Sequence, residues 1–213
     1  MATARSKPSE SNRGTRELLI DAAEREIAHK GLEALTMKDL AKEVGIKTPS
    51  IYAHFAGRDD ILRAIADRYV AALSVQFPDD GGDPLDTILA GVRSLVIYFA
   101  SHPAHVRLKL RDLETPGGRP ELSAAAGGEA SSNLNEGPLR DFFARIEGLL
   151  HRGHEIGQIR RVSVVEFYRI CFGVTLLSLT WPTQGIFTSQ QDSAEISRIL
   201  PFAETAIRSF LVR

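Results

Sequence analysis

The sequence has a single cysteine and almost no net charge, and each scarcity excludes a class of protein. One thiol, Cys171, cannot form an intrachain disulfide framework or a cysteine zinc site, and it fits a reducing compartment. The formal net charge of −1 predicts no polyelectrolyte partner for the molecule as a whole. Residues 1–69 carry 12 basic and 11 acidic side chains, so any argument for nucleic-acid binding depends on where the charges lie.

Long apolar segments free of charge are also missing. The most apolar run, 162–181, contains Glu166, Arg169 and several hydroxyl side chains, which suits a buried helix better than a membrane span. The first sixteen residues are polar and show no apolar signal core, and residues 1–12 have the composition of a disordered tail. We therefore expect a soluble, cytoplasmic protein with no membrane partner.

Apolar residues recur at helical spacing along most of the chain, and no strand pair or hairpin is evident. The predicted fold is all-α with about nine helices, the last of them kinked at Pro201. The expected helices cover 13–30, 36–44, 48–56, 58–77, 85–101, 104–114, 139–157, 162–181 and 194–212.

The clearest linker signal is the segment PDDGGDP at 78–84. A second segment poor in large apolar residues, 115–138, predicts a mobile loop. The predicted organisation is a tail over 1–12, a first helical domain over 13–57, a connecting helix over 58–77 and a second helical domain over 78–213.

Two short helices that meet at Gly45, under a preceding helix, have the layout of a helix-turn-helix DNA reader. No acidic residue occurs from Val44 to Arg58, so nothing there repels phosphate. Small or polar side chains near the start of the second helix suit a major groove, and the hydroxyl and imidazole that follow can donate to phosphate oxygens. The predicted DNA-binding residues are Thr36, Lys47, Thr48, Pro49, Ser50, Tyr52, His54 and Arg58.

Structural roles are the alternative for several of these residues. Core packing is the alternative for Phe55 and, less strongly, for Tyr52, and a charged helix start is the alternative for Arg58 with Asp59 and Asp60. The register of all of them together favours the DNA-binding interpretation.

Residues 13–62 resemble the DNA-binding domain of the TetR family of bacterial transcriptional regulators. The matching residues are Lys30-Gly31, Thr36, Leu40-Ala41, Gly45-Ile46, Ile51-Tyr52-Ala53-His54-Phe55, Arg58 and Leu62. Ile27 departs from the family where an aromatic residue is frequent. Lys47 replaces a capping serine, so we expect Thr48 to cap the recognition helix, and Pro49 replaces a small residue. The operator sequence therefore cannot be inferred from relatives.

The resemblance implies a helical domain that encloses a small-molecule pocket and a dimer formed by the last two helices. Those helices are apolar on more than one face here, which suits burial against both the chain and a partner. Aromatic walls with few charges predict an apolar or aromatic effector. The candidate effector-binding residues, for each of which ordinary core packing is the alternative, are Tyr98, Phe99, His102, Phe142, Phe143, Phe167, Tyr168, Cys171 and Trp181.

Two histidine pairs at HxxH spacing, His102/His105 and His151/His154, raise the question of a metal site. Capping and surface roles account for them better, and we expect neither metal nor cofactor. The predicted function is a ligand-responsive repressor that binds a double-stranded DNA operator as a homodimer. An activator or global regulator with the same DNA-binding mode remains open. An enzyme or lipid carrier is disfavoured, because no nucleophile with a base and no phosphate loop is present.

Overall fold

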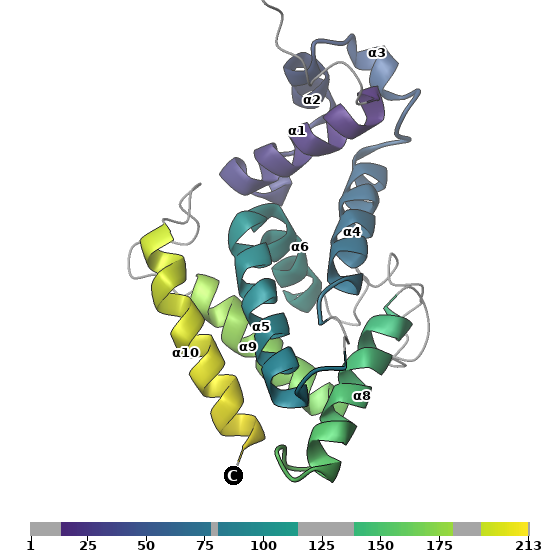
Figure 1. The fold of residues 1–213 in the computed structure, drawn as a ribbon. Helices are drawn as coiled ribbons and strands as arrows, with labels where there is room; N and C mark the ends of the chain where they lie inside the picture. The colour runs from purple at the N-terminus through teal and green to yellow at the C-terminus, as the bar shows by residue number, and fades with distance from the viewer. Residues whose placement is uncertain (1–13, 78–80, 115–138, 181–192, 213) are drawn as a thin grey trace, which may run out of the picture.

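The computed structural model describes residues 14–77, 81–114, 139–180 and 193–212, and all regular structure in those ranges is helical (Figure 1). The all-α prediction is confirmed. The expected helix limits fall within a few residues of the observed ones, except for the recognition helix. In order, the elements are α1 Thr15–Lys30, the 3-10 turn η1 Leu32–Ala34, α2 Met37–Val44, α3 Thr48–Ile51, α4 Arg58–Ser74, α5 Pro84–Ser101, α6 Pro103–Glu114, α8 Arg140–Glu155, α9 Val164–Thr180 and α10 Ser193–Leu211.

Residues 14–57, which we call the head, form one end of the molecule (Figure 1). Its α2 begins as predicted, because the hydroxyl of Thr36 accepts a hydrogen bond from the backbone N–H of Asp39 at 3.1 Å. The helix ends at Gly45, whose φ of 79° is in the left-handed region that favours glycine. Buried Leu40 and Ile51 join the apolar face of α1, so the two short helices are held under the first.

The start of α3 corrects the expected capping. Lys47 occupies the N-cap position without a side-chain cap bond, and Thr48 is already the first helical residue. The prediction that Thr48 caps this helix is therefore wrong. Pro49 follows as the second helical residue, where its missing N–H leaves no partner unpaired.

The recognition helix is also shorter than expected, since α3 ends at Ile51 and not near Gly57. Beyond it the backbone N–H groups of His54 and Phe55 both bond to the carbonyl of Ile51, at 2.9 and 3.0 Å. This tight turn lets Phe55 enter the core, where its side chain is 1% exposed.

Residues 81–212, which we call the body, are built around α5. The helix contacts α6, α8, α9 and α10, which lie around it in Figure 1. Among the described helices α5 is long and apolar enough to cross a membrane by length and composition, and 56% of it is buried inside the protein. The helix α4 connects head and body, because it packs on α1 at one end and on α8 at the other.

Several expectations lie outside the described residues. These are the tail over 1–12, the loop over 115–138 and residues 78–80 of the linker. Pro201 lies inside α10, and a kink at that residue stays a prediction. The division into four segments stays a prediction.

Candidate nucleic-acid interface

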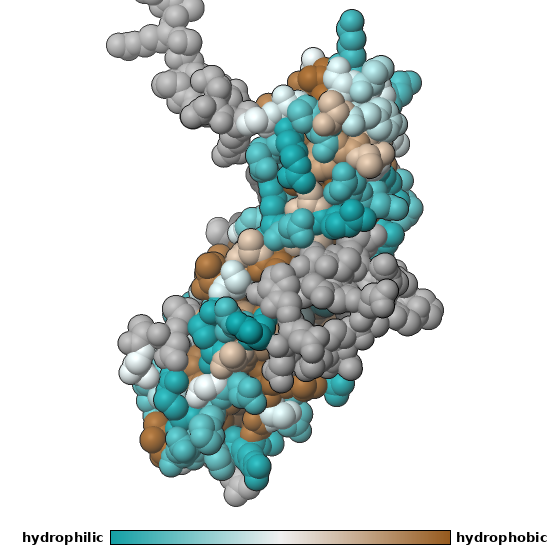
Figure 2. Space-filling view, turned by 90° about the vertical axis from the view of Figure 1, so that its right-hand side faces the viewer, coloured by the Kyte–Doolittle hydropathy of each residue, from teal (hydrophilic) through white to brown (hydrophobic). Residues whose placement is uncertain are grey.

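The turn and the recognition helix place most of the predicted DNA-binding residues on the surface. Tyr52 is 56% exposed, so its interpretation as a core aromatic is wrong, whereas Phe55 is a core residue. The exposed side chains also include Lys47, Pro49, Ser50 and His54, and Thr48 is half-buried. Hydrophilic and weakly polar residues cover much of the head on the face shown in Figure 2. This surface presents donors and one basic group with no carboxylate between residues 44 and 58.

Arg58 is held inside the fold and is not freely presented. Its guanidinium donates a hydrogen bond to the carbonyl oxygen of Leu32 at 2.7 Å and lies 3.5 Å from a carboxylate oxygen of Glu33. It therefore ties the start of α4 to η1. Contact between Arg58 and a phosphate stays a prediction.

Thr36 is exposed, and its hydroxyl already has two roles in the fold. It accepts from the N–H of Asp39 and donates to the Asp39 carboxylate at 2.6 Å. A DNA contact by Thr36 stays a prediction, because any such bond competes with this cap.

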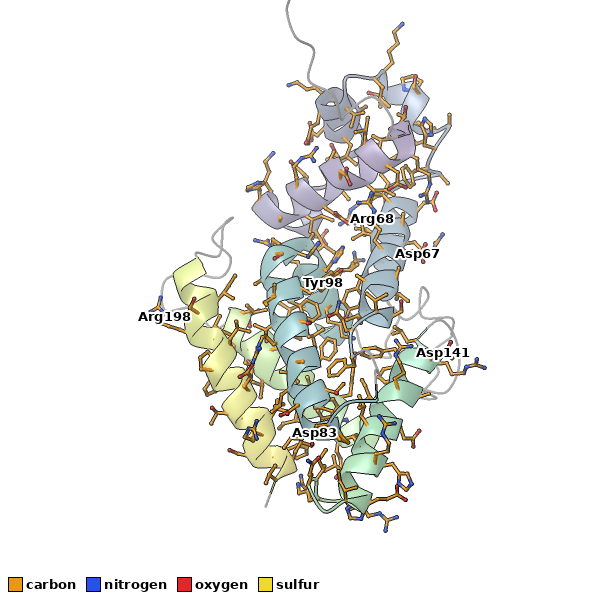
Figure 3. All side chains as sticks on the ribbon, in the orientation of Figure 1. Asp67, Arg68, Asp83, Tyr98, Asp141 and Arg198 are labelled. Carbon is orange, nitrogen blue, oxygen red and sulfur yellow. The ribbon has the colours of Figure 1, made fainter. Side chains whose placement is uncertain are left out.

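The head is tied to α4 by a charge cluster that no local sequence pattern predicts. Nη1 of Arg68 donates to the carboxylates of Asp21, at 2.7 Å, and Glu24, at 3.3 Å. Its Nη2 pairs with Glu17 at 2.5 Å, so one guanidinium binds three acids along α1. Hydrogen bonds to these acids outweigh the cost of burial and raise the pKa of Arg68. Arg68, labelled in Figure 3, therefore ties α4 to α1.

This arrangement of helices around an exposed turn matches known proteins. Residues 19–65 match the model of a family described as bacterial regulatory proteins, tetR family. Residues 19–65 are therefore similar to this family, and the match covers most of the head and the start of α4. It is 34% identical to the HTH-type transcriptional repressor ComR of Escherichia coli over 55 residues, 26% of this chain and 26% of ComR.

Longer comparisons extend the likeness to the body. Over 82% of this chain and 74% of the relative, it is 27% identical to an uncharacterised HTH-type transcriptional regulator of Mycobacterium tuberculosis. The ketosteroid transcriptional regulator KstR2 of the same organism superposes with a TM-score of 0.67 at 18% identity, covering 97% of this chain and 100% of that one. The fold is therefore like that of these solved proteins, and the relatives matched by sequence are named transcriptional regulators.

In the body of this TetR-type fold, most of the candidate effector residues come together as one aromatic chain. Ring centroids lie 5.6 Å apart for Tyr98 and Phe99, 5.2 Å for Phe143 and Tyr168, and 5.1 Å for Phe142 and Phe143. The chain is completed by Phe172, which sequence reasoning missed and which lies 5.6 Å from Phe99 and 4.3 Å from Tyr168.

A second group of rings surrounds the end of α4. Phe77 contacts Phe142 at 5.8 Å and Phe167 at 6.0 Å, both edge to face. Cys171 is buried, and burial raises the pKa of its thiol to about 12. Trp181 lies outside the described residues. Effector contact by any of these residues stays a prediction, because rings such as Phe99 and Phe167 are also packed core at 1% exposure.

The histidine pairs have structural partners. Nδ1 of His102 bonds to the carbonyl oxygen of Tyr98 at 2.8 Å, and its ring stacks on the Tyr98 ring. His151 lies on the surface beside Glu155, and Nδ1 of His154 donates to the carbonyl of Ile159 at 3.1 Å. Within the described ranges, no group of three or more potential ligands is arranged to hold a metal ion.

Proposed function

We propose that this TetR-family regulator binds a palindromic operator as a homodimer in the cytoplasm. The observation that carries the proposal is the surface over residues 45–58, where Ile51 and Phe55 point inward and the intervening polar side chains outward, with no acid among them. Lys47, Tyr52 and His54 are the residues we assign to contact with DNA. Phosphate contacts of this kind fix the position of a recognition helix in the major groove.

A dimer is supported by the apolar surface of the last two described helices. Leu177 on α9 and Phe202 on α10 are each 61% exposed, and they line one groove of about 380 Å³ together with Ile199. Single exposed apolar residues are ordinary, but a shared apolar groove favours burial against a second copy. Two heads about 34–36 Å apart reach successive major grooves of a palindrome, which one short helix cannot do alone.

Release by a small apolar or aromatic effector is supported by the aromatic chain of the body. The aromatic chain runs from α5 through α9 to α8. On α9, the buried hydroxyl of Thr175 has no hydrogen-bond partner among the described residues. Such a hydroxyl can orient a ligand that the rings bind. An effector that prefers a different placement of α4 shifts the population of DNA-competent molecules, by a typical coupling of about 1–3 kcal/mol.

The test is footprinting of purified protein on DNA from the neighbourhood of its own gene. A protected palindrome at physiological salt, lost when the effector is added, is the expected result. A protein with both Lys47→Ala and Tyr52→Phe is the negative control. Both side chains are exposed, so we expect this variant to fold like the wild type and to lose the protected palindrome. The absence of any protected palindrome overturns the proposal.

Repression is favoured over activation because the relative that matches the head with 34% identity is named a repressor. Deletion of the gene distinguishes the two modes. Derepression of a reporter behind the operator supports repression, and loss of reporter expression supports the activator or global regulator.

A further inference from the structure

A chain of three side chains crosses the boundary between head and body. The hydroxyl of Tyr98 on α5 lies 2.6 Å from Nδ1 of His105 on α6, and Nε2 of His105 lies 3.2 Å from a carboxylate oxygen of Glu24 on α1. Figure 3 shows Tyr98 inside the body, below the end of α1 and beside the helix that carries Arg68. The head therefore has a hydrogen-bonded connection to the aromatic part of the body.

The chemistry of the three groups fixes the direction of both hydrogen bonds. Burial alone would raise the pKa of Glu24, but the hydrogen bond from His105 and the charge of Arg68 outweigh it and lower that pKa. Glu24 is thus a carboxylate, which only accepts. Nε2 of His105 must then carry the hydrogen, so Nδ1 is an acceptor and the Tyr98 hydroxyl is its donor.

Because the site is buried, the two hydrogen bonds of His105 depend on all three side chains, Tyr98, His105 and Glu24. His105 is 3% exposed, and burial lowers the pKa of its imidazole, so the ring stays neutral. If the Tyr98 hydroxyl turns elsewhere, Nδ1 loses its donor at a site that water does not readily reach. The ring also packs edge to face on Tyr69 of α4 at 5.8 Å. A displaced His105 therefore disturbs both connections of the head, through α1 and through α4.

The Tyr98 ring belongs to the aromatic chain of the body. Its centroid lies 5.6 Å from that of Phe99, which in turn contacts Phe172 on α9. The hydroxyl on which the orientation of His105 depends is therefore carried by a ring of the aromatic chain.

We propose that the Tyr98–His105–Glu24 chain is a latch that holds the head in its DNA-competent orientation. An effector with a hydrogen-bond acceptor, such as a carbonyl or carboxylate oxygen, opens the latch by taking the Tyr98 hydroxyl away from His105. This rests on the proposed function and makes it more specific. It assigns the effector class, an apolar compound with an acceptor oxygen, and it assigns Tyr98, His105 and Glu24 as positioning residues.

Three variants and one control test the latch. Tyr98→Phe removes only the hydroxyl, His105→Leu removes both ring nitrogens, and His105→Gln retains one donor and one acceptor. Ser101→Ala is the matched control, because that hydroxyl is at the same end of α5 and donates only to the carbonyl of Ile97 in its own helix. Thermal unfolding followed by circular dichroism establishes that each protein is folded.

The readouts are operator affinity and the distance between the two heads of the dimer. A spin label attached to the cysteine of a Lys42→Cys variant, at an exposed position of α2, gives that distance by pulsed electron paramagnetic resonance. The native Cys171 is buried and stays unlabelled. We expect Tyr98→Phe and His105→Leu to weaken operator binding about 5- to 100-fold and to broaden or shift the distance. His105→Gln recovers part of the loss, and Ser101→Ala matches the wild type.

Two results overturn the latch, and they differ in what else they affect. In the first, wild type binds its operator as a dimer, and the folded Tyr98→Phe and His105→Leu proteins have the operator affinity and the head-to-head distance of the wild type. The hydrogen bonds among Tyr98, His105 and Glu24 are then merely structural, and the proposed function stands. If wild type shows no operator binding or no distance between heads, the proposed function and the latch fall together.

Discussion

The ring of Phe77 lies directly on the backbone of Gly91, so closely that a Cβ on residue 91 would be 2.2 Å from Cδ1 of the ring. Phe77 follows the end of α4, has a φ of 56° and is 1% exposed. Glycine in the middle of α5 therefore leaves the space for the residue that anchors the connecting helix to the body. The contact fixes where α4 ends, and α4 is the element that moves the head in the proposed mechanism.

Gly91→Ala should destabilise the protein by about 1–3 kcal/mol, because the added methyl group forces Phe77 out of a packed site. Chemical denaturation of the purified protein measures this. Gly148→Ala in α8 is the control, since a Cβ there meets Arg152 only at 3.7 Å and the helix gains about 0.5–1 kcal/mol from losing a glycine. Equal stability of the two variants would contradict the contact.

Arg68→Met should cost about 1–3 kcal/mol and leave three carboxylates on α1 without their common partner. The loss should grow at low ionic strength, where the acids repel each other over a longer range. Denaturation at two salt concentrations tests both points. Arg63→Met is the matched control on α4, because its side chain is 56% exposed and its contact with Asp60 is 3.5 Å long. That change should cost less than about 1 kcal/mol.

Thr36→Val should destabilise the head by about 1 kcal/mol, since the first amides of α2 lose their acceptor. Thr36→Ser retains the hydroxyl and should be close to the wild type. If Thr36 also contacts DNA, operator affinity in the valine variant will fall by more than the stability loss explains. The comparison needs denaturation and DNA titration of the same preparations.

Lys47→Ala should weaken operator and non-operator DNA alike. It should also reduce the slope of log affinity against log salt by about 1 for each head, because one phosphate contact is lost. Fluorescence anisotropy at several salt concentrations measures the slope. Lys30→Ala is the control, since Lys30 pairs with Glu26 at 2.8 Å on the far end of α1. An unchanged slope in the Lys47 variant would place that lysine away from the phosphates.

Acid should weaken the fold through His105. Its pKa is lowered in the folded protein, mainly by burial, so below about pH 6.5 the unfolded chain binds a proton that the native state does not. Stability therefore falls as the pH falls from 6.5 toward the folded pKa, by at most about 1.4 kcal/mol per pH unit. Glu24, whose folded pKa is also lowered, adds to the loss below about pH 4.5.

The pH dependence is measured by denaturation of wild type and His105→Gln between pH 5 and 8. The variant should have a flatter profile over the range in which His105 titrates. His29→Gln, exposed on α1, should leave the wild-type profile unchanged. A variant profile as steep as that of the wild type would show that other groups cause the dependence.

Most helix limits were predictable because they depend on local chemistry. Thr36 caps α2 and Gly45 ends it, and both effects involve residues within one turn of each other. The end of α3 was not predictable in this way: the helix stops at Ile51, and Phe55, four residues on, is buried in the core. The position of Arg58 at a helix start predicts a phosphate contact, and only its partner Leu32, 26 residues away, shows the competing role.

The sequence by itself determined the helical fold and the acid-free stretch over residues 45–57, because periodicity, caps and local charge are properties of neighbouring residues. Tertiary structure decided how the head is held. The pairs Arg68–Asp21 and His105–Glu24 join residues 47 and 81 positions apart, and no local pattern marks such partners. Their chemistry follows from burial and contact, which arise only when α1, α4, α5 and α6 pack together.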